Sequence, residues 1–400
     1  GETLAELQAD PRYEPFLEQA EALLNAKDRI PYGSIRGQHI YNFWRDAEHV
    51  RGIVRRTSLE SYRTAKSEWE TVLDVDALAK SENENWVYKG IAWLAPGYER
   101  CLVELSRGGT DASVHREFDT LAKRFVEGGF VLPEAKSDVT WLDRDTLLVG
   151  TNWGDGSLTK SGYPRISKRW KRGTPLAKAA TIFEGREEDI SISPRVMDSG
   201  EATLPMITQS LTFYTGAYLL IGDDGKLLRL PLPESVDLAG FFAGRILFTL
   251  RDAWEVAGRT FSQGSLLAID AAAFRATGEL PRVEIIYTPD DRTSIEGVTV
   301  SRSGLYVSLL KNVKGRILRF GVDADSGKWS AEPLPLPDNG TVSLSAANPH
   351  SETVLVNYED HITPDQLSEY DAGANALTRL KSLPARFRAD GLQVSQHTVR

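Results

Sequence analysis

The segment RCLVELSRGGTDASVHREFD, residues Arg100 to Asp119, decides the fold of this chain. Two runs rich in aliphatic and aromatic side chains flank a Gly-Gly turn, and the second run ends in an aromatic residue followed by Asp119. Such residues are typical of strands, and an aspartate can start a turn by accepting hydrogen bonds from nearby backbone amides. The segment therefore predicts a strand pair with a turn after it, and not a helix.

The same arrangement recurs along the chain. Apolar strands that end in Gly, Asp or Asn include TLLVGTNWG, YLLIGDDG, RILFTLRD, GLYVSLLKN and TVLVNYED, and aspartates close later strands at Asp270, Asp323 and Asp371. Strand pairs begin near His39, Cys101, Thr146, Thr203, Ile246, Leu305 and Val354. Their spacing of about 45 to 60 residues is near the period of propeller blades. We therefore predict an all-β fold, a seven-bladed β-propeller over residues 31–383, since radial packing keeps so long an all-β chain in one domain. A pair of β-sandwiches is the alternative, but it does not account for the repeated spacing.

A short helical arm over residues 1–30 precedes the strands. Leu4, Leu7, Phe16 and Leu23 recur at helical spacing, while Pro11 and Pro15 divide the arm into two helices. So short an arm cannot form its own core, and its apolar face is expected to pack on another part of the protein. The last residues, 384–400, are polar and resemble a connection to a further part of the polypeptide.

Composition excludes several classes of protein. The 400 residues carry a net charge of −9 and are 41% hydrophobic, which predicts a soluble globular protein without nucleic acid as a partner. The single cysteine, Cys101, excludes an intrachain disulfide and a zinc site built from cysteines. No apolar run is long enough to span a membrane. We expect a cytoplasmic protein, with the periplasm as an alternative because the chain begins with Gly1 and not with methionine.

Several motifs resemble the amino-terminal propeller of the prolyl oligopeptidase family of serine peptidases. Within residues 73–150 the family's parts follow one another in order, and no one of them is specific alone. They are an LDxNxL-like opening at Leu73 to Leu78, a Pro-x-x-x-Arg turn at Pro96 to Arg100, an SxGGxD-like loop at Ser106 to Asp111, the aromatic-Asp end at Phe118 and Asp119, and a V-x-W turn at Val139 to Trp141. A GTP segment at Gly173 to Pro175 and an apolar pair with Glu at Ile182 to Glu184 come next.

The resemblance covers nearly the whole chain and implies a function. The arm is similar to part of the segment that packs on the family's catalytic domain, and residues 384–400 are similar to the run that leads into an α/β-hydrolase domain. The front is shorter than in the family, and Asp76 stands where the family often has asparagine. The resemblance implies a propeller that caps an active site, admits short peptides and excludes folded proteins. The catalytic serine, aspartate and histidine would all lie in the domain that is absent here.

The residues themselves do not supply that chemistry. A hydrolase nucleophile needs a G-x-S-x-G turn, and none occurs. The histidines share no metal-binding spacing, so no metal or other cofactor is predicted; they are His39, His49, His115, His350, His361 and His397. Three local patterns are better explained as turns or loops: the acidic cluster Glu359 to His361, the glycine-rich stretch from Gly154, and the glycosylation-like Asn339 to Thr341.

The cationic stretch PRISKRWKRG, Pro164 to Gly173, is the strongest local anomaly. We interpret it as a strand with a solvated cationic side, in preference to a nucleic-acid site. Four of its cations are candidates for contacts with peptide or with the central tunnel: Arg165, Lys168, Arg169 and Arg172. Two other functions stay open for the chain, a propeller that binds a protein or peptide on its own, and a hydrolase or lyase with a site in the central channel.

Overall fold

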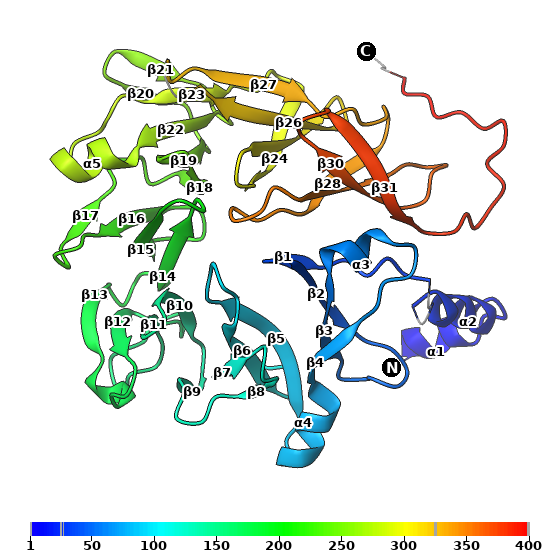
Figure 1. Ribbon diagram of the computed structural model, residues 1–400, viewed down its shortest axis with the longest axis horizontal. Helices are drawn as coiled ribbons and strands as arrows, with labels where there is room; N and C mark the ends of the chain where they lie inside the picture. The colour runs from blue at the N-terminus through cyan, green and yellow to red at the C-terminus, as the bar shows by residue number, and fades with distance from the viewer. Residues whose placement is uncertain (1, 25, 27, 324–325, 398–400) are drawn as a thin grey trace.

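Seven antiparallel sheets follow one another along the chain as the blades of a ring, shown in Figure 1. The computed structural model describes residues 2–24, 26, 28–323 and 326–397, so parts of the predicted arm and of the predicted connection lie outside the described residues. Each blade has four strands in sequence order from the centre outward. The second blade adds β9, and the fifth carries an extra hairpin, β20 with β21.

The strands have the following bounds. Blade 1 contains β1 (Ser34–Arg36), β2 (His39–Trp44), β3 (Ile53–Ser58) and β4 (Glu70–Asp74); blade 2 contains β5 (Trp86–Trp93), β6 (Arg100–Arg107), β7 (Ser113–Asp119), β8 (Arg124–Phe125) and β9 (Val131–Ala135). Blade 3 contains β10 (Asp138–Asp143), β11 (Thr146–Gly150), β12 (Ile166–Lys171) and β13 (Ala180–Glu184); blade 4 contains β14 (Ser191–Asp198), β15 (Thr203–Ser210), β16 (Gly216–Ile221) and β17 (Leu227–Arg229). Blade 5 contains β18 (Val236–Phe242), β19 (Arg245–Leu250), β20 (Trp254–Val256), β21 (Arg259–Phe261), β22 (Leu266–Asp270) and β23 (Glu284–Tyr287). Blade 6 contains β24 (Thr293–Val300), β25 (Leu305–Lys311), β26 (Lys314–Val322) and β27 (Trp329–Pro333); blade 7 contains β28 (Thr341–Ala346), β29 (Val354–Glu359), β30 (Gln366–Asp371) and β31 (Ala376–Ser382).

The seven predicted starting points all fall at the second strand of a blade, so the predicted count of blades is confirmed. Second strands are apolar because both of their faces are covered. In β11, Leu147 and Val149 pack toward blade 2, while Leu148, on the opposite face of the strand, packs toward blade 4. Such a strand loses the alternation of apolar and polar residues and becomes a continuous apolar run.

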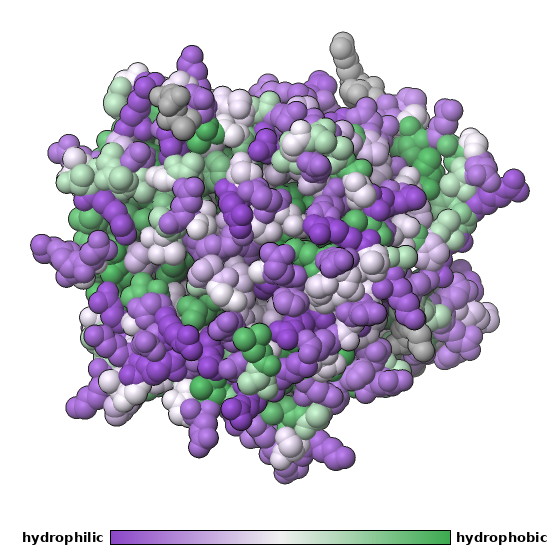
Figure 2. Space-filling view, viewed as in Figure 1, coloured by the Kyte–Doolittle hydropathy of each residue, from purple (hydrophilic) through white to green (hydrophobic). Residues whose placement is uncertain are grey.

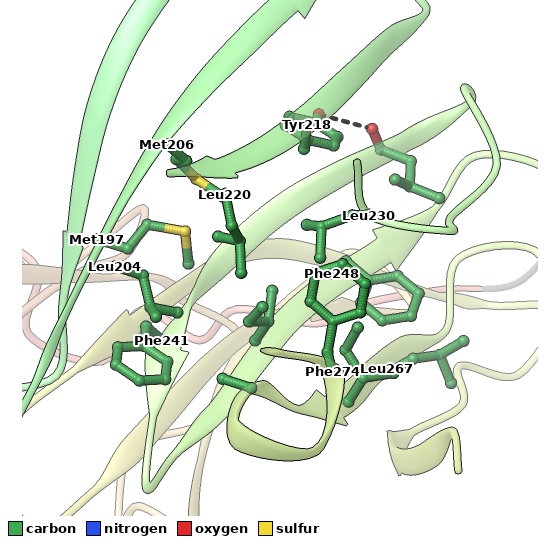
Figure 3. Close-up of a cluster of buried hydrophobic side chains, with 14 of the residues drawn as sticks. Met197, Leu204, Met206, Tyr218, Leu220, Leu230, Phe241, Phe248, Leu267 and Phe274 are labelled. Atoms are coloured by element: carbon green, nitrogen blue, oxygen red, sulfur yellow. Dashed lines mark hydrogen bonds between the residues drawn. The ribbon is translucent and has the colours of Figure 1, made fainter. Parts of the chain in front are cut away.

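The core is divided among the blade interfaces. Seven clusters of buried side chains lie between successive blades, one at each interface of the ring. Figure 3 shows the cluster between blades 4 and 5, in which Met206, Leu220 and Phe248 pack together and the hydroxyl of Tyr218 donates a 2.9 Å hydrogen bond to the carbonyl of Val236. Each blade is therefore held by its two neighbours.

Blades 1 and 7 close the ring without sharing a strand, since all strands of each blade come from one end of the chain. Their interface buries Ile35, Tyr62 and Leu355. Arg63 adds a bidentate contact with Glu369, at 2.7 and 2.6 Å. Side-chain packing and surface hydrogen bonds therefore hold blades 1 and 7 together in place of a shared strand.

The helices are short. The arm consists of α1 (Glu2–Gln8) and α2 (Tyr13–Leu24), as predicted, and it lies at the edge of the ring beside blade 1 (Figure 1). The remaining helices connect strands: α3 (Leu59–Arg63), α4 (Val75–Glu82), the 3₁₀ turn η1 (Leu176–Lys178) and α5 (Ala271–Thr277). None of the helices in the described ranges combines the length and the apolar character that crossing a membrane would require.

The predicted aspartate turns are present, with one difference. Asp119 accepts hydrogen bonds from the amides of Leu121 and Ala122, and Asp371 does the same for Gly373 and Ala374. Asp270 instead accepts from the amide of Ala273 and caps the start of α5. An aspartate serves both purposes because each needs only a short acceptor beside free backbone amides.

Candidate functional site

The two faces of the ring carry different parts of the chain. Because the four strands of a blade alternate in direction, the start of the first strand and the end of the fourth lie on one face. We call this the end face: it also carries the turns between second and third strands. The hairpins between first and second strands emerge on the other side, the hairpin face. The chain leaves blade 7 on the end face, where Gln396 donates to the carbonyl of Asn312 in the turn after β25.

Large apolar side chains stand exposed on the end face. Three turns between second and third strands carry them: Val50 in blade 1, Phe213 and Tyr214 in blade 4, and Val313 in blade 6. Phe213 is 83% exposed and Val313 is 79% exposed. Neighbouring exposed aromatic side chains are typical of contact sites, because burying them releases ordered water.

The arm presents a second apolar surface. Neither α1 nor α2 buries a residue, and Phe16 and Leu24 are 74% and 73% exposed. An amphipathic helix is usually stabilised by covering its apolar face, since short helices are marginal in water. The prediction that this face packs on another part of the protein therefore finds no such partner within the described residues.

A cleft of about 830 Å³ opens between blades 5 and 6 on the end face. Its charged lining consists of Asp237, Arg251, Asp290, Asp291 and Glu296. Arg251 holds Asp237 through two contacts of 2.8 and 2.9 Å, and its guanidinium lies 5.8 Å from the ring of Tyr214. The side-chain hydrogen bond from Thr293 lowers the pKa of Asp290. The cleft is thus a polar, net acidic surface beside the exposed aromatic turn.

The four predicted cationic contacts lie on or beside β12, the third strand outward from the centre of blade 3. Arg165 stands at the end-face end of the strand, and Arg172 follows its hairpin-face end. Seven residues of extended chain separate them by about 23 Å. The structure therefore does not gather the four side chains in one patch.

These cations already have contacts within the blade. Arg165 donates to the carbonyls of Gly156 and Gly185 and pairs with Glu184 at 2.8 Å. Lys168 lies 4.4 Å from the centre of the Trp153 ring. The Nε atom of Arg169 is buried without a hydrogen-bond partner among residues that the structure describes. A peptide contact for any of them stays a prediction.

Arg172 joins blades 2 and 3 through the buried carboxylate of Glu117. Its guanidinium contacts both oxygens of Glu117 at 2.7 and 3.0 Å, and its Nε atom contacts Asp145 at 2.8 Å. The Glu117 side chain is 1% exposed and also accepts the amide of Phe130. Bidentate pairing of this kind fixes geometry, so Arg172 has a structural role whatever else it contacts.

The histidines form no metal centre in the described part of the chain. His115 is buried beside Glu104 and Asp138, and burial lowers the pKa of His115 and raises the pKa of Asp138. His350 pairs with Asp198 across the ring, at 2.7 Å. Neither arrangement offers the nucleophile and base that an acyl transfer needs.

The three patterns interpreted as turns are turns. Glu359 ends β29, and Asp360 accepts the amides of Ile362 and Thr363. The glycine-rich stretch lies in the loop between β11 and β12, and Asn339 adopts a left-handed conformation with φ of 68°. Their residue types are explained by backbone geometry.

Comparison with known proteins identifies the family. Residues 6–209 and 258–382 match the family model of the prolyl oligopeptidase N-terminal β-propeller domain. The chain belongs to the prolyl oligopeptidase family. An uncharacterized peptidase of Sinorhizobium fredii is 38% identical over 98% of this chain and 55% of its own length, and one of Rickettsia prowazekii is 27% identical over 90% and 51%. The structure of a post-proline cleaving enzyme from Rickettsia typhi superposes with a TM-score of 0.89 at 26% identity, covering 96% of this chain and 58% of that one.

The chain thus spans about half the length of the peptidases that it matches. Family membership agrees with the motifs between Leu73 and Gly150. The motifs did not indicate the exposed turn at Phe213 and Tyr214 or the cross-ring pair of Asp198 and His350. For the turn a signal existed, two adjacent aromatic residues between threonines in LTFYTG, whereas the pair has no sequence signal because 152 residues separate its members.

Proposed function

We propose that this chain is the gating half of a prolyl oligopeptidase-like serine peptidase. In this role the ring covers the active site of a second, catalytic domain and lets short peptides reach it while folded proteins stay outside. The observation that carries the proposal is the end face, which carries the exposed apolar turns and the polar cleft and from which the chain leaves blade 7, together with the uncovered arm beside blade 1. Family membership and relatives of about twice the length support it.

The same features indicate a role for each part of the chain. The arm over residues 1–30 and the connection over 384–400 would contact the catalytic domain, while residues 31–383 form the ring. Val50, Phe213 and Val313 would lie toward the chamber between the domains, where apolar turns can contact either the second domain or a peptide. The serine, histidine and aspartate of the reaction would come from that domain. We also propose a cytoplasmic location, which the lack of cysteine pairs supports.

The test compares the full-length protein with this 400-residue chain. Both receive a short chromogenic prolyl peptide, a serine-directed covalent probe, and the same prolyl sequence embedded in a folded protein. We expect the full-length protein to cleave the short peptide and take up the probe, and this chain to do neither.

The third substrate tests gating itself. We expect the full-length protein to leave the folded substrate intact and to cleave it once it is denatured, because only a flexible chain would pass the ring. Equal cleavage of folded and denatured substrate would contradict gating. An inert full-length protein would contradict the peptidase and leave a propeller that binds a partner.

A further inference from the structure

Hairpins from opposite blades meet at the axis on the hairpin face. Asp198 ends β14 in blade 4, and His350 lies between β28 and β29 in blade 7. Their side chains are joined at 2.7 Å between Nε2 and Oδ2. In a ring of seven, blades 4 and 7 are three blades apart by the shorter way round, which is the largest separation possible. A direct contact between them must therefore cross the centre of the ring.

A third hairpin joins the same contact. Tyr98, from the turn between β5 and β6 in blade 2, places its hydroxyl 3.0 Å from Oδ1 and 2.9 Å from Nδ2 of Asn348. Asn348 also donates to the carbonyl of Ile35 in blade 1, at 2.8 Å. Tyr98 and Asn348 are 6% and 4% exposed although both lie in connections between strands. Such burial of polar loop residues requires that the loops pack on one another.

The backbones pack as closely as the side chains. Gly200, in the turn after β14, has φ of +85°, and a β-carbon there would lie 2.1 Å from the carbonyl oxygen of Pro349. Tyr98 also adopts a positive φ of 57°, which is unusual for a bulky residue and needs surrounding contacts to hold it. We call this group of six residues the axial plug: Tyr98, Asp198, Gly200, Asn348, Pro349 and His350.

The rest of the centre is solvated. Lys89, Arg195 and Glu296 are exposed although they lie on the innermost strands of their blades. The hairpin face differs, because there the hairpins touch across the axis. Figure 2, viewed as in Figure 1, accordingly shows side chains over the centre of the ring and no open passage along that direction.

We propose that the axial plug closes the hairpin-face end of the ring, so that a peptide can reach the centre only from the end face. The proposal rests on the gating function proposed above and deepens it. Selection by size would then take place between the ring and the catalytic domain, and not along the axis of the ring. Tyr98, Asp198, Asn348 and His350 determine this route by holding three hairpins together.

The first test asks whether the plug holds in solution, and it needs no activity. Asp198→Ala, His350→Ala and the double variant of this chain are compared by thermal unfolding. We expect His350→Ala to lower Tm in the wild-type background and to lower it much less after Asp198→Ala, because the pair acts as a unit. If the Tm loss of the double variant equals the sum of the losses in the two single variants, the plug is contradicted.

A glycine pair provides the matched control. Gly200→Ala and Gly258→Ala both place a β-carbon at positive φ, but nothing lies within 4 Å of the added carbon at Gly258. The excess loss of Tm in Gly200→Ala therefore measures the contact with Pro349. Equal losses in both variants would count against close packing of the hairpins.

The second test asks which end peptides use. A biotin acceptor peptide is inserted at Gly244, in the turn between β18 and β19 on the hairpin face, where nothing lies within 4 Å of an added β-carbon. Streptavidin then covers the hairpin face of the full-length protein. We expect kcat/KM for the short prolyl peptide to change by less than about twofold. The variant Asp198→Ala/His350→Ala is expected to become sensitive to streptavidin, since its axis is open.

A severalfold loss of kcat/KM on adding streptavidin to the wild-type protein would overturn the proposal, because peptides would then use the hairpin face. Absence of any peptide cleavage before streptavidin is added would instead refute the proposed function. The thermal experiment still decides whether the plug exists in that case, so the two failures are distinguishable.

Discussion

Replacing Arg172 with alanine is expected to destabilise the protein by about 3–5 kcal/mol, the usual loss when one partner of a buried ion pair is removed. In this variant the Glu117 carboxylate, which is 1% exposed, would keep only one of the hydrogen bonds that it now accepts, the one from the amide of Phe130. Its two contacts with the guanidinium, at 2.7 and 3.0 Å, would be lost. A buried carboxylate without a cation must take up a proton or draw in water, and either response lowers the stability of the blade interface.

The expected change is measurable by heat or denaturant. For a chain of 400 residues, an unfolding entropy of about 2.1 cal/mol/K per residue converts this loss to a fall in Tm of roughly 4–6 °C. Arg229→Ala is the matched control, because Arg229 pairs with Glu234 at 3.0 Å with both side chains more than half exposed. That pair is expected to contribute less than about 1 kcal/mol.

A double variant separates charge from packing. Glu117→Met together with Arg172→Met removes both charges and keeps similar volume, so it is expected to recover much of the loss seen in Arg172→Ala. A free energy of unfolding for Arg172→Ala within about 0.5 kcal/mol of the wild-type value, the range of an ordinary surface substitution, would contradict this expectation. Reduced peptide turnover at unchanged stability would instead assign Arg172 to substrate contact.

Three further outcomes are expected. The side-chain hydrogen bond with Asp365, together with burial and repulsion between the two carboxylates, raises the pKa of Glu359. The folded state therefore holds the proton of Glu359 more tightly than the unfolded state does, and it loses stability as pH rises above the ordinary glutamate range. Glu359→Gln should therefore raise Tm near neutral pH and give no gain at about pH 4, whereas an equal gain at both would exclude this linkage. Burial raises the pKa of the Cys101 thiol, so a thiol reagent should leave the native chain unmodified and label one site after denaturation; rapid labelling of native protein would show that β6 opens. Phe274 is fully buried between blades 4 and 5, and Phe274→Ala should lower the free energy of unfolding in guanidinium by about 3–5 kcal/mol; a loss under about 1 kcal/mol would mean that the cluster repacks.

The sequence by itself determined the number of blades. Second strands such as β11 and β25 pack against neighbours on both faces, so they are continuous apolar runs that stand out at a regular spacing. The first strand of a blade has a weaker apolar pattern in the sequence. In β24, exposed Ser294 and Glu296 alternate with half-buried residues, because this strand borders the solvated centre. That is why the predicted units begin one strand late.

The sequence also determined the helical arm, the turn aspartates and the family, since each depends on residues close together in the chain. Only the tertiary structure decided what the cations and histidines do. Arg172 reaches Glu117 across 55 residues, and His350 reaches Asp198 across 152. Contacts of this length arise when the ring closes and sets blade against blade. No local spacing encodes them, because the chain between the two partners can vary in length without changing which side chains meet.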